Sequence, residues 1–536
     1  MDLVSLFPLP EEVPARLIIE PVQQRRYLSG GELVNWNGPF EEVLSPVRFR
    51  SGSTLSRNFI GSYPSLGEKE SMEILNASTA AYGNGRGVWP TLTADERIRS
   101  VEVFTAKMGE KRETISKLLM WETGKSLNDS LREFDRTTAN IAGVIANLKK
   151  MVQKYSRMII SEGIAAQIGR SPLGIVLCMG PYNYPLNETF AALIPALAMG
   201  NCVILKPPRF GILLYEPLLE LFRKFFPPGA INTIYGDGNR VIAPLMKSGK
   251  IDALAFIGTH AVAETLKQLH PKPHRLRCVM GLGAKNAAII LPDADLDLSV
   301  KETVLGSLAF NGQRCTALKI LFVHKSIAGA FIERFCGALK HLVIGMPWTD
   351  NVTITPLPEL EKAGYLEGLV KDALDRGASI VNEYGGTNCE SLYYPAVLYP
   401  VRETMRVYSE EQFGPVIPIV PYEDIETPLR FVIDSDFGQQ VSIFGRDGDS
   451  IGSIIDPLIN QVCRININCK CQRGPDALPF TGRKDSAEGT LSISEALQAF
   501  SIQTLVAVRD TDLNRSIIRN IKKNRRSNFL NNDNTG

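Results

Sequence analysis

The sequence has 536 residues, of which 44% are hydrophobic and 22% charged, with a formal net charge of +2. This length predicts about three or four structural units in an ordinary globular chain. The near-neutral charge gives no reason to expect nucleic acid as a partner, and no apolar run approaches the roughly 18 residues of a membrane span. Met1–Leu3 does not begin an export signal, and the nine scattered cysteines fit a reducing compartment, so we expect a cytoplasmic protein.

The N-terminal third is predicted to be mainly helical after an irregular start. Residues 1–70 are rich in Pro, Gly, Arg and Glu and predict a lead-in with short strands. Residues 71–125 have a helical pattern, in which Thr93 or Asp95 can cap a helix. A second helical stretch is predicted over about 128–153.

Between residues 174 and 291, short apolar runs alternate with amphipathic segments. Repeated strand–helix–strand units predict a parallel sheet with helices on both faces and ligands at the carboxyl ends of its strands. A second such series from 287 to about 457 predicts a second α/β domain. In the first series we expect strands at 175–179, 202–205, 231–235 and 253–257, and helices at 188–199, 213–226 and 240–248.

The C-terminal residues 511–536 differ from the rest of the chain. Residues 515–526 are basic, and residues 528–536 are mostly polar with four asparagines. This composition predicts a disordered tail.

Cys315 is the strongest candidate for a catalytic residue. It lies in the heptapeptide Phe-Asn-Gly-Gln-Arg-Cys-Thr, residues 310–316. A thiol reacts as the thiolate, and the adjacent cation Arg314 would lower its pKa. Asn311 and Gly312 indicate a loop in which the sulfur can be reached. The other eight cysteines are interpreted as small buried apolar residues.

Several segments carry groups that could complete a site. Asn183, just past a predicted strand, is a neutral donor of the kind that stabilises an oxyanion, although taken alone it is better interpreted as a turn residue. Lys206 and Arg209 follow the next strand and could bind ribose hydroxyls or a phosphate. Gly258 and Thr259 lie between a strand and a helix, where a helix N-terminus attracts phosphate oxygens.

Two further observations limit the cofactor and metal assignments. No Gly-x-Gly-x-x-Gly segment is present, so the ordinary dinucleotide fingerprint is absent. Cys469 and Cys471 are too close together for the usual zinc spacing, and we assign no metal.

Glu411 precedes a Phe-Gly-Pro turn that begins at Phe413, and its carboxylate could hold ribose or be one of an exposed acidic pair.

These segments, in this order, resemble the aldehyde dehydrogenase superfamily over about residues 30–510. The Gly-Gln-Arg-Cys-Thr segment at 312–316 and the Glu-Gln-Phe-Gly-Pro segment at 411–415 carry the resemblance. Residues 183–185 and the Cys-Gln-Arg-Gly-Pro-Asp segment at 471–476 look most like the branch that oxidises glyceraldehyde 3-phosphate with NADP and without phosphorylation. An Arg at position 209, where NAD-preferring relatives often carry Glu, favours the 2′-phosphate of NADP.

The resemblance implies a role for each matching residue. Cys315 would attack the aldehyde, and Asn183 with the Cys315 backbone N–H would form the oxyanion hole. The cofactor NADP would be held by Lys206, Arg209, Gly258, Thr259, Glu411 and Phe413. The substrate phosphate would be bound by Tyr184, Arg314 and Arg473, and arginine forks suit a phosphorylated substrate on chemical grounds alone.

The resemblance also implies an architecture of two Rossmann-like doubly wound domains with a small β element for oligomerisation, assembled as a homotetramer. The cofactor-binding domain would comprise residues 1–149 and 173–283, and the catalytic domain residues 284–484. The oligomerisation segments would be 150–172 and 485–510, with the tail at 511–536.

One departure leaves the reaction open. Most of the superfamily has Glu-Leu-Gly-Gly-Lys ahead of the nucleophile, with that Glu as general base, whereas here Gly281 takes its place in Gly-Leu-Gly-Ala-Lys-Asn. Loss of a general base costs about 10²–10⁴ in rate. We expect oxidation of glyceraldehyde 3-phosphate to 3-phosphoglycerate through a Cys315 thioester. The alternatives are a coenzyme A-acylating aldehyde dehydrogenase, whose motif also carries Ala-Lys-Asn, and a cofactor-binding protein with little turnover.

Overall fold

The computed structural model describes residues 2–52 and 54–530. Its centre is a six-stranded sheet in the order β10-β9-β8-β11-β12-β26, parallel except for the last pair. Four of its strands were predicted, and this sheet confirms the expected α/β class. The strands are β8 (Ile175–Met179), β9 (Cys202–Lys206), β10 (Ile231–Thr233), β11 (Ala253–Ile257), β12 (Arg277–Gly281) and β26 (Ala487–Glu488).

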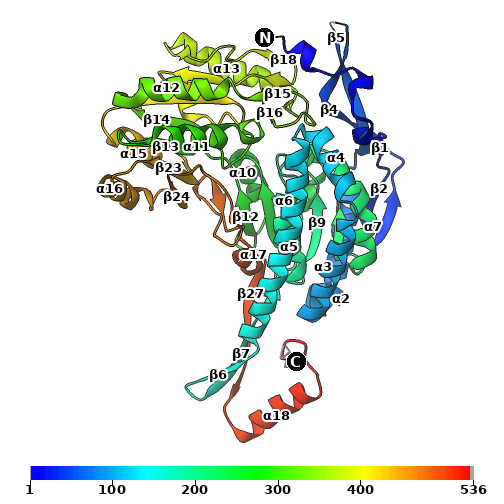
Figure 1. Ribbon diagram of the computed structural model, residues 1–536. Helices are drawn as coiled ribbons and strands as arrows, with labels where there is room; N and C mark the ends of the chain where they lie inside the picture. The colour runs from blue at the N-terminus through cyan, green and yellow to red at the C-terminus, as the bar shows by residue number, and fades with distance from the viewer. Residues whose placement is uncertain (1, 53, 531–536) are drawn as a thin grey trace.

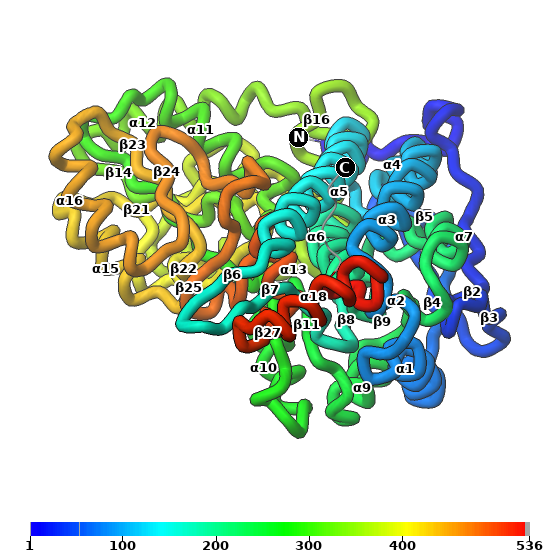
Figure 2. Tube along the Cα trace, turned by 90° about the horizontal axis from the view of Figure 1, so that it is seen from below, coloured from blue at the N-terminus to red at the C-terminus, as the bar shows by residue number. Residues whose placement is uncertain are grey.

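Helices cover both faces of this sheet. In Figure 2, α5 and α6 lie on one side of β8, β9 and β11, and α1, α9 and α10 lie on the other. Thr93 caps α3 by accepting a hydrogen bond from the N–H of Glu96, as predicted. The helices are α1 (Glu68–Tyr82), α2 (Val88–Thr91), α3 (Ala94–Gly109), α4 (Arg112–Thr123), α5 (Leu127–Tyr155), α6 (Asn187–Ala198), α7 (Glu216–Phe225), α8 (Gly238–Val241), α9 (Ala243–Lys247), α10 (His260–Leu269) and α17 (Ile493–Ala499).

The helix predicted over 240–248 forms as two short helices, α8 and α9. Pro244 lies in the first turn of α9, where it has no N–H to continue the hydrogen-bond ladder of α8.

A seven-stranded sheet forms the second domain, in the order β17-β20-β21-β14-β13-β23-β24. Its strands are parallel except for β17, so the second α/β series is confirmed. Its strands are β13 (Ala287–Ile290), β14 (Ile320–His324), β17 (Ser379–Ile380), β20 (Ala396–Tyr399), β21 (Val416–Tyr422), β23 (Gln440–Phe444) and β24 (Arg464–Ile467), and its longer helices are α11 (Leu296–Leu308), α12 (Lys325–Leu339), α13 (Lys362–Asp375), α15 (Glu426–Asp434) and α16 (Gly448–Leu458).

A three-stranded antiparallel sheet projects from the body, as Figure 1 shows. It consists of β6 (Met158–Ser161), β7 (Ile164–Pro172) and β27 (Ser501–Arg509), in the order β27-β7-β6. Its strands come from the two segments that the resemblance assigns to oligomerisation.

The lead-in contains longer strands than expected. β4 (Phe40–Ser51) and β5 (Thr54–Pro64) form an antiparallel pair, and β1 (Val22–Gln23) adds to β5. The pairing shifts register between Ser45 and Phe49, where Pro46 cannot donate a ladder hydrogen bond. This proline, with the glycines nearby, obscured the strand signal in the sequence.

The C-terminal segment is ordered up to residue 530, where the sequence predicted a disordered tail from 511. Helix α18 (Asp512–Lys523) begins at Thr511, whose hydroxyl accepts from the N–H of Asn514. The segment then folds back, because Gln167 donates to the carbonyl of Phe529 at 3.2 Å and Asn528 donates to the carbonyl of Thr91 at 2.7 Å. Residues 531–536 lie outside the described residues. None of the helices in the described ranges is long and apolar enough to cross a membrane.

Candidate active site

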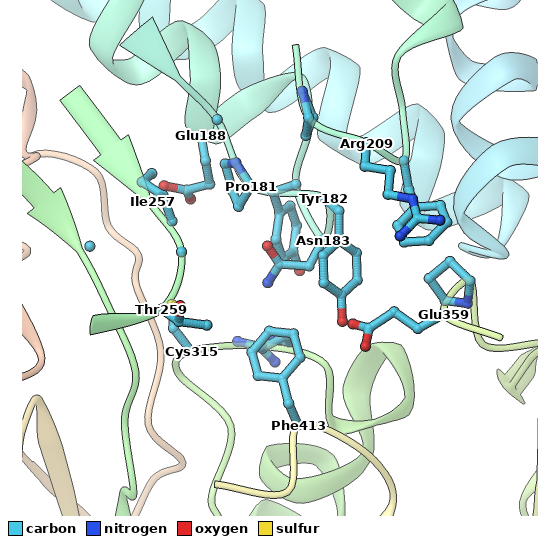
Figure 3. Close-up of a pocket in the computed structure, with 18 of the residues that line it drawn as sticks. Pro181, Tyr182, Asn183, Glu188, Arg209, Ile257, Thr259, Cys315, Glu359 and Phe413 are labelled. Carbon is cyan, nitrogen blue, oxygen red and sulfur yellow. The ribbon is translucent and has the colours of Figure 1, made fainter. Parts of the chain in front are cut away.

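A cavity of about 1270 Å³ lies between the two domains and reaches the carboxyl ends of β8, β9 and β11. Its wall includes every site residue predicted from the sequence. These are Cys315, Asn183, Lys206, Arg209, Gly258, Thr259, Glu411, Phe413, Tyr184, Arg314 and Arg473. Figure 3 shows Asn183, Thr259, Cys315 and Phe413 around this pocket.

The loop before Cys315 has a strained backbone that is held from several sides. Phe310, Asn311 and Gly312 have φ values of 50°, 56° and 72°, a left-handed run that costs energy in non-glycine residues. The Asn311 amide donates to the carbonyl of Thr355 at 3.0 Å and accepts from its N–H at 2.9 Å. A Cβ at Gly312 would lie 2.7 Å from the carbonyl oxygen of Ser307, so only glycine fits there.

The Ala-Lys-Asn segment fixes the same region from the second domain. The Asn286 side chain donates to the carbonyl of Cys315 at 2.8 Å and to that of Ala317 at 3.0 Å. The Lys285 ammonium donates to the carbonyl of Glu410 and to the side chain of Gln412, at 2.8 Å to the latter. Because Lys285 and Asn286 are adjacent in the chain, their contacts fix the position of the nucleophile loop relative to the Glu411 turn. This role does not depend on which reaction the site performs.

Asn183 faces the nucleophile loop directly. Its Nδ2 donates to the carbonyl of Gln313 at 2.9 Å, and the residue is buried. An amide nitrogen carries two N–H groups, so a second one is available for an oxyanion. The carbonyl of Asn183 accepts from Nζ of Lys125 at 2.7 Å.

Burial raises the pKa of the Cys315 thiol above its ordinary value, because the surrounding protein disfavours the charged thiolate. The Glu411 carboxylate raises it further, while Arg314, a hydrogen bond from Gln439 and Lys319 oppose the rise. The expected effect of Arg314 is present, but desolvation outweighs it. Arg314 and Lys319 are the cations that favour the thiolate of Cys315 against this desolvation.

The cavity wall also has groups that a dinucleotide requires. Burial lowers the pKa of Lys206 to about 8, and its ammonium makes a 3.2 Å hydrogen bond to the carbonyl of Pro207. Arg209 is exposed at the mouth, with its guanidinium 5.5 Å from the ring of Phe210. Thr259 caps α10, so the first turn of that helix faces the cavity.

The Glu411 carboxylate is also suited to bind a hydroxyl group. Its Oε1 is buried, lies 3.4 Å from Nζ of Lys319, and accepts no hydrogen bond from the described residues. A buried acceptor without a donor is costly, and a ribose hydroxyl would satisfy it. These residues therefore fit a nicotinamide dinucleotide, and the Phe413 ring lines the same cavity.

Several cations line the cavity. The Arg314 guanidinium donates to the hydroxyl of Thr316 at 2.9 Å and lines the cavity. Arg473 is buried and ion-paired with Glu188, and it lies 3.6 Å from Asp476. Burial lowers the pKa of Arg473 to about 10, so it remains a cation at neutral pH.

Three charged residues of this region were missed in the sequence. Arg136 lines the cavity and makes a bidentate pair with Asp476, at 2.6 and 3.0 Å. Lys125 is fully buried, paired with Glu133, and 3.8 Å from the ring centroid of Tyr184. Glu188 is at the start of α6. All three lie on predicted helical stretches, where a charge is ordinarily assigned to a solvated face.

Residues 48–506 match the profile of the Aldehyde dehydrogenase family. The chain belongs to this family. It is 32% identical over 459 residues to an NADP-dependent glyceraldehyde-3-phosphate dehydrogenase of Streptococcus equinus, covering 84% of this chain and 92% of that relative. It is 26% identical over 462 residues to a lactaldehyde dehydrogenase of Methanococcus aeolicus, covering 84% and 95% respectively.

Among solved structures, the fold is similar to the NADP complex of NADP-dependent glyceraldehyde-3-phosphate dehydrogenase from Bacillus halodurans C-125. The TM-score is 0.83 at 30% identity, covering 91% of this chain and all of that one. Membership of the aldehyde dehydrogenase family supports an aldehyde oxidoreductase reaction with a nicotinamide cofactor, and the predicted resemblance is confirmed.

Gly281, at the end of β12, has space for a side chain. A Cβ there would meet Ile257 at 3.5 Å and Leu491 at 3.6 Å, which are ordinary contacts. A Cβ at position 281 is therefore compatible with the surrounding fold.

The electrostatic environment of Cys315 predicts opposite effects of two substitutions. Glu411→Gln removes a charge that raises the pKa of Cys315, so the pH midpoint of thiolate formation should fall. Arg314→Gln removes a charge that lowers this pKa, so the midpoint should rise. The measurement is the rate of iodoacetamide alkylation of the Cys315 peptide against pH, with exposed Glu423→Gln as the control. Shifts in the same direction would contradict this assignment of causes.

Proposed function

We propose that this enzyme oxidises glyceraldehyde 3-phosphate to 3-phosphoglycerate with NADP. The observation that carries the proposal is that one cavity is lined by Cys315, by the proposed cofactor ligands and by Arg136, Arg314 and Arg473. Its similarity to two NADP-dependent glyceraldehyde-3-phosphate dehydrogenases and to one solved structure of such an enzyme supports it, at 30–32% identity.

The substrate phosphate would be bound at the cationic end of the cavity. Tyr184, Arg314 and Arg473 are the residues that the sequence assigned to it, and Arg136 is a further cation on the same wall. Guanidinium groups match phosphate oxygens by paired hydrogen bonds. Because Asp476 and Glu188 already pair with two of these cations, the phosphate would share them with carboxylates.

The chain's own groups account for the chemistry at the aldehyde. The Cys315 thiolate adds to the carbonyl carbon, and Nδ2 of Asn183 with the Cys315 N–H stabilises the oxyanion. A bound nicotinamide supplies the hydride acceptor. Loss of hydride from the thiohemiacetal leaves a thioester on Cys315, and hydrolysis of that thioester releases the acid.

Gly281 supports a second candidate, a coenzyme A-acylating aldehyde dehydrogenase. With no carboxylate at 281, a thiol cosubstrate could replace water in the release step. The third hypothesis, a cofactor-binding protein with little turnover, is disfavoured by the intact groups of Cys315, Asn183 and Lys206 in one cavity. The proposed location is the cytoplasm.

The proposed assembly is a homotetramer formed through the projecting sheet of β6, β7 and β27. The domain limits proposed from the sequence place this element at 150–172 and 485–510. Two of its apolar side chains are strongly exposed, Ile160 at 63% and Leu505 at 59%. Exposed apolar edge strands are a liability unless another strand covers them.

Turnover with glyceraldehyde 3-phosphate tests the reaction. Sustained NADPH formation without coenzyme A is expected, because hydrolysis regenerates Cys315, and Cys315→Ser should abolish it. The assay measures NADPH absorbance together with the product. A single burst that becomes turnover only when coenzyme A is added would favour the acylating reaction, and no burst would refute the proposed substrate.

The cofactor preference depends on Arg209. Arg209→Ala should reduce the ratio of kcat/KM for NADP to that for NAD by about 10- to 100-fold, because a hydrogen bond to a charged group contributes about 1.5–3 kcal/mol. Steady-state kinetics with both cofactors provide the measurement. Arg240→Ala, at another exposed arginine, is the matched control. An unchanged ratio would refute the role of Arg209.

The assembly depends on the exposed strands. Ile160→Asp places a charge on the edge strand β6, and light scattering should then detect a species smaller than the wild-type tetramer. Ile18→Asp, at a residue 56% exposed elsewhere on the surface, should leave the mass unchanged. A monomeric wild type, or a tetramer that persists in the Ile160→Asp variant, would contradict the proposed interface.

A further inference from the structure

Hydrolysis of a thioester on Cys315 needs a group that accepts a proton from the attacking water, and Gly281 cannot supply it. This inference rests on the proposed function for its hydrolytic step. Among the described residues, six carboxylates line the cavity and could accept this proton, namely those of Glu41, Glu42, Glu188, Glu359, Glu361 and Glu411.

The other five carboxylates are all more exposed than Glu188. Glu41 accepts a hydrogen bond from Ser65 at 3.0 Å and lies with Glu42 on strand β4 of the lead-in. Glu359 pairs with Lys362 at 3.2 Å, and Glu361 is exposed just before α13. Glu411 lies beside Lys319 and is the proposed ribose ligand, which leaves Glu188.

Glu188 is held in the wall of the cavity. It is in the first turn of α6, directly after the Asn183 loop, and its side chain is only 11% exposed. Its carboxylate is ion-paired with Nη1 of Arg473. The ion pair engages Oε2, whereas Oε1 accepts only a 3.5 Å hydrogen bond from the side chain of Asn187, so Oε1 can accept a further hydrogen bond from water.

Arg473 is itself fixed, so it sets the direction of Glu188. Its Nη2 donates to the carbonyl of Leu491 at 3.1 Å, and its guanidinium lies 4.7 Å from the ring centroid of Phe480. In the view of Figure 3, the carboxylate of Glu188 points towards Ile257, another residue of the cavity wall.

These contacts connect Glu188 to the position that Gly281 leaves open. Leu491 binds Arg473 through its carbonyl, and its side chain would lie 3.6 Å from a Cβ at Gly281. Ile257 would lie 3.5 Å from the same Cβ. The wall of the cavity therefore contains both Gly281, which has no carboxylate, and the buried carboxylate of Glu188 on α6. Leu491 and Arg473 connect the two positions.

We propose that Glu188 is the general base of thioester hydrolysis in this enzyme. Water adds to the thioester carbon while one of its protons passes to the Glu188 carboxylate. The carbon–sulfur bond then breaks, the Cys315 thiolate leaves, and the acid is released. No oxidation occurs in this step, and Glu188 returns its proton to solvent. Arg473 gains a second role as the residue that positions Glu188.

The test acylates Cys315 without the aldehyde or the cofactor, so that it is independent of the proposed substrate. p-Nitrophenyl acetate releases nitrophenolate as it acetylates a reactive thiol. In Glu188→Gln, the initial burst should match wild type, whereas the steady rate should fall about 10²- to 10⁴-fold, since a general base contributes that much. Mass spectrometry of the acid-quenched variant should find acetylated Cys315.

A rescue and a control complete the experiment. The double variant with Glu188→Gln and Gly281→Glu should recover the steady rate, because the carboxylate is restored at the open position. Glu361→Gln makes the same change at an exposed position of the same cavity and should behave as wild type. A Glu188→Gln variant with an undiminished steady rate would overturn the proposal. Loss of the burst together with the steady rate would also overturn it, because Glu188 would then act on the nucleophile or the fold.

Discussion

The buried ion pair between Lys125 and Glu133 fixes the geometry on which the site depends. Both side chains are fully buried, and every charge is satisfied: Lys125 also donates to the carbonyl of Asn183, and Glu133 accepts from the N–H groups of Leu186 and Asn187 at 3.0 and 3.1 Å. Removing one partner of such a pair costs about 3–5 kcal/mol, because the other charge stays buried. Helix α5 thereby sets the loop that presents Asn183 and the first turn of α6.

The second domain holds the other half of the site by a similar device. The buried ammonium group of Lys285 donates to the main-chain carbonyl of Glu410, and that of Lys319 donates to the carbonyl of Gly312 at 3.1 Å. Burial lowers the pKa of both lysines, and carbonyl partners compensate for the lost hydration. The nucleophile loop and the Glu411 turn are thus rigid before any ligand binds, which suits catalysis by preorganised dipoles.

The sequence identified the site residues that lie in recognisable local motifs. It missed the site residues whose role depends on contacts with parts of the chain far away in sequence. Asn183 follows the carboxyl end of β8, where parallel-sheet topology predicts a site, and Cys315 lies in a distinctive segment before β14. Arg136 and Glu188 lie on helices, and only the fold shows that these helix faces line the cavity. The C-terminal helix had a local signal in the Thr511 cap, but the contacts of Phe529 with β7 and of Asn528 with Thr91 could not be deduced from composition.

The most direct test of the account is to identify the acyl intermediate. The wild-type enzyme would be mixed with glyceraldehyde 3-phosphate and NADP, quenched in acid within the first turnover, and digested for peptide mass spectrometry. The account predicts a phosphoglyceroyl adduct on the Cys315 peptide that is absent without NADP. NADPH formed with no adduct, or with the adduct on another cysteine, would contradict it.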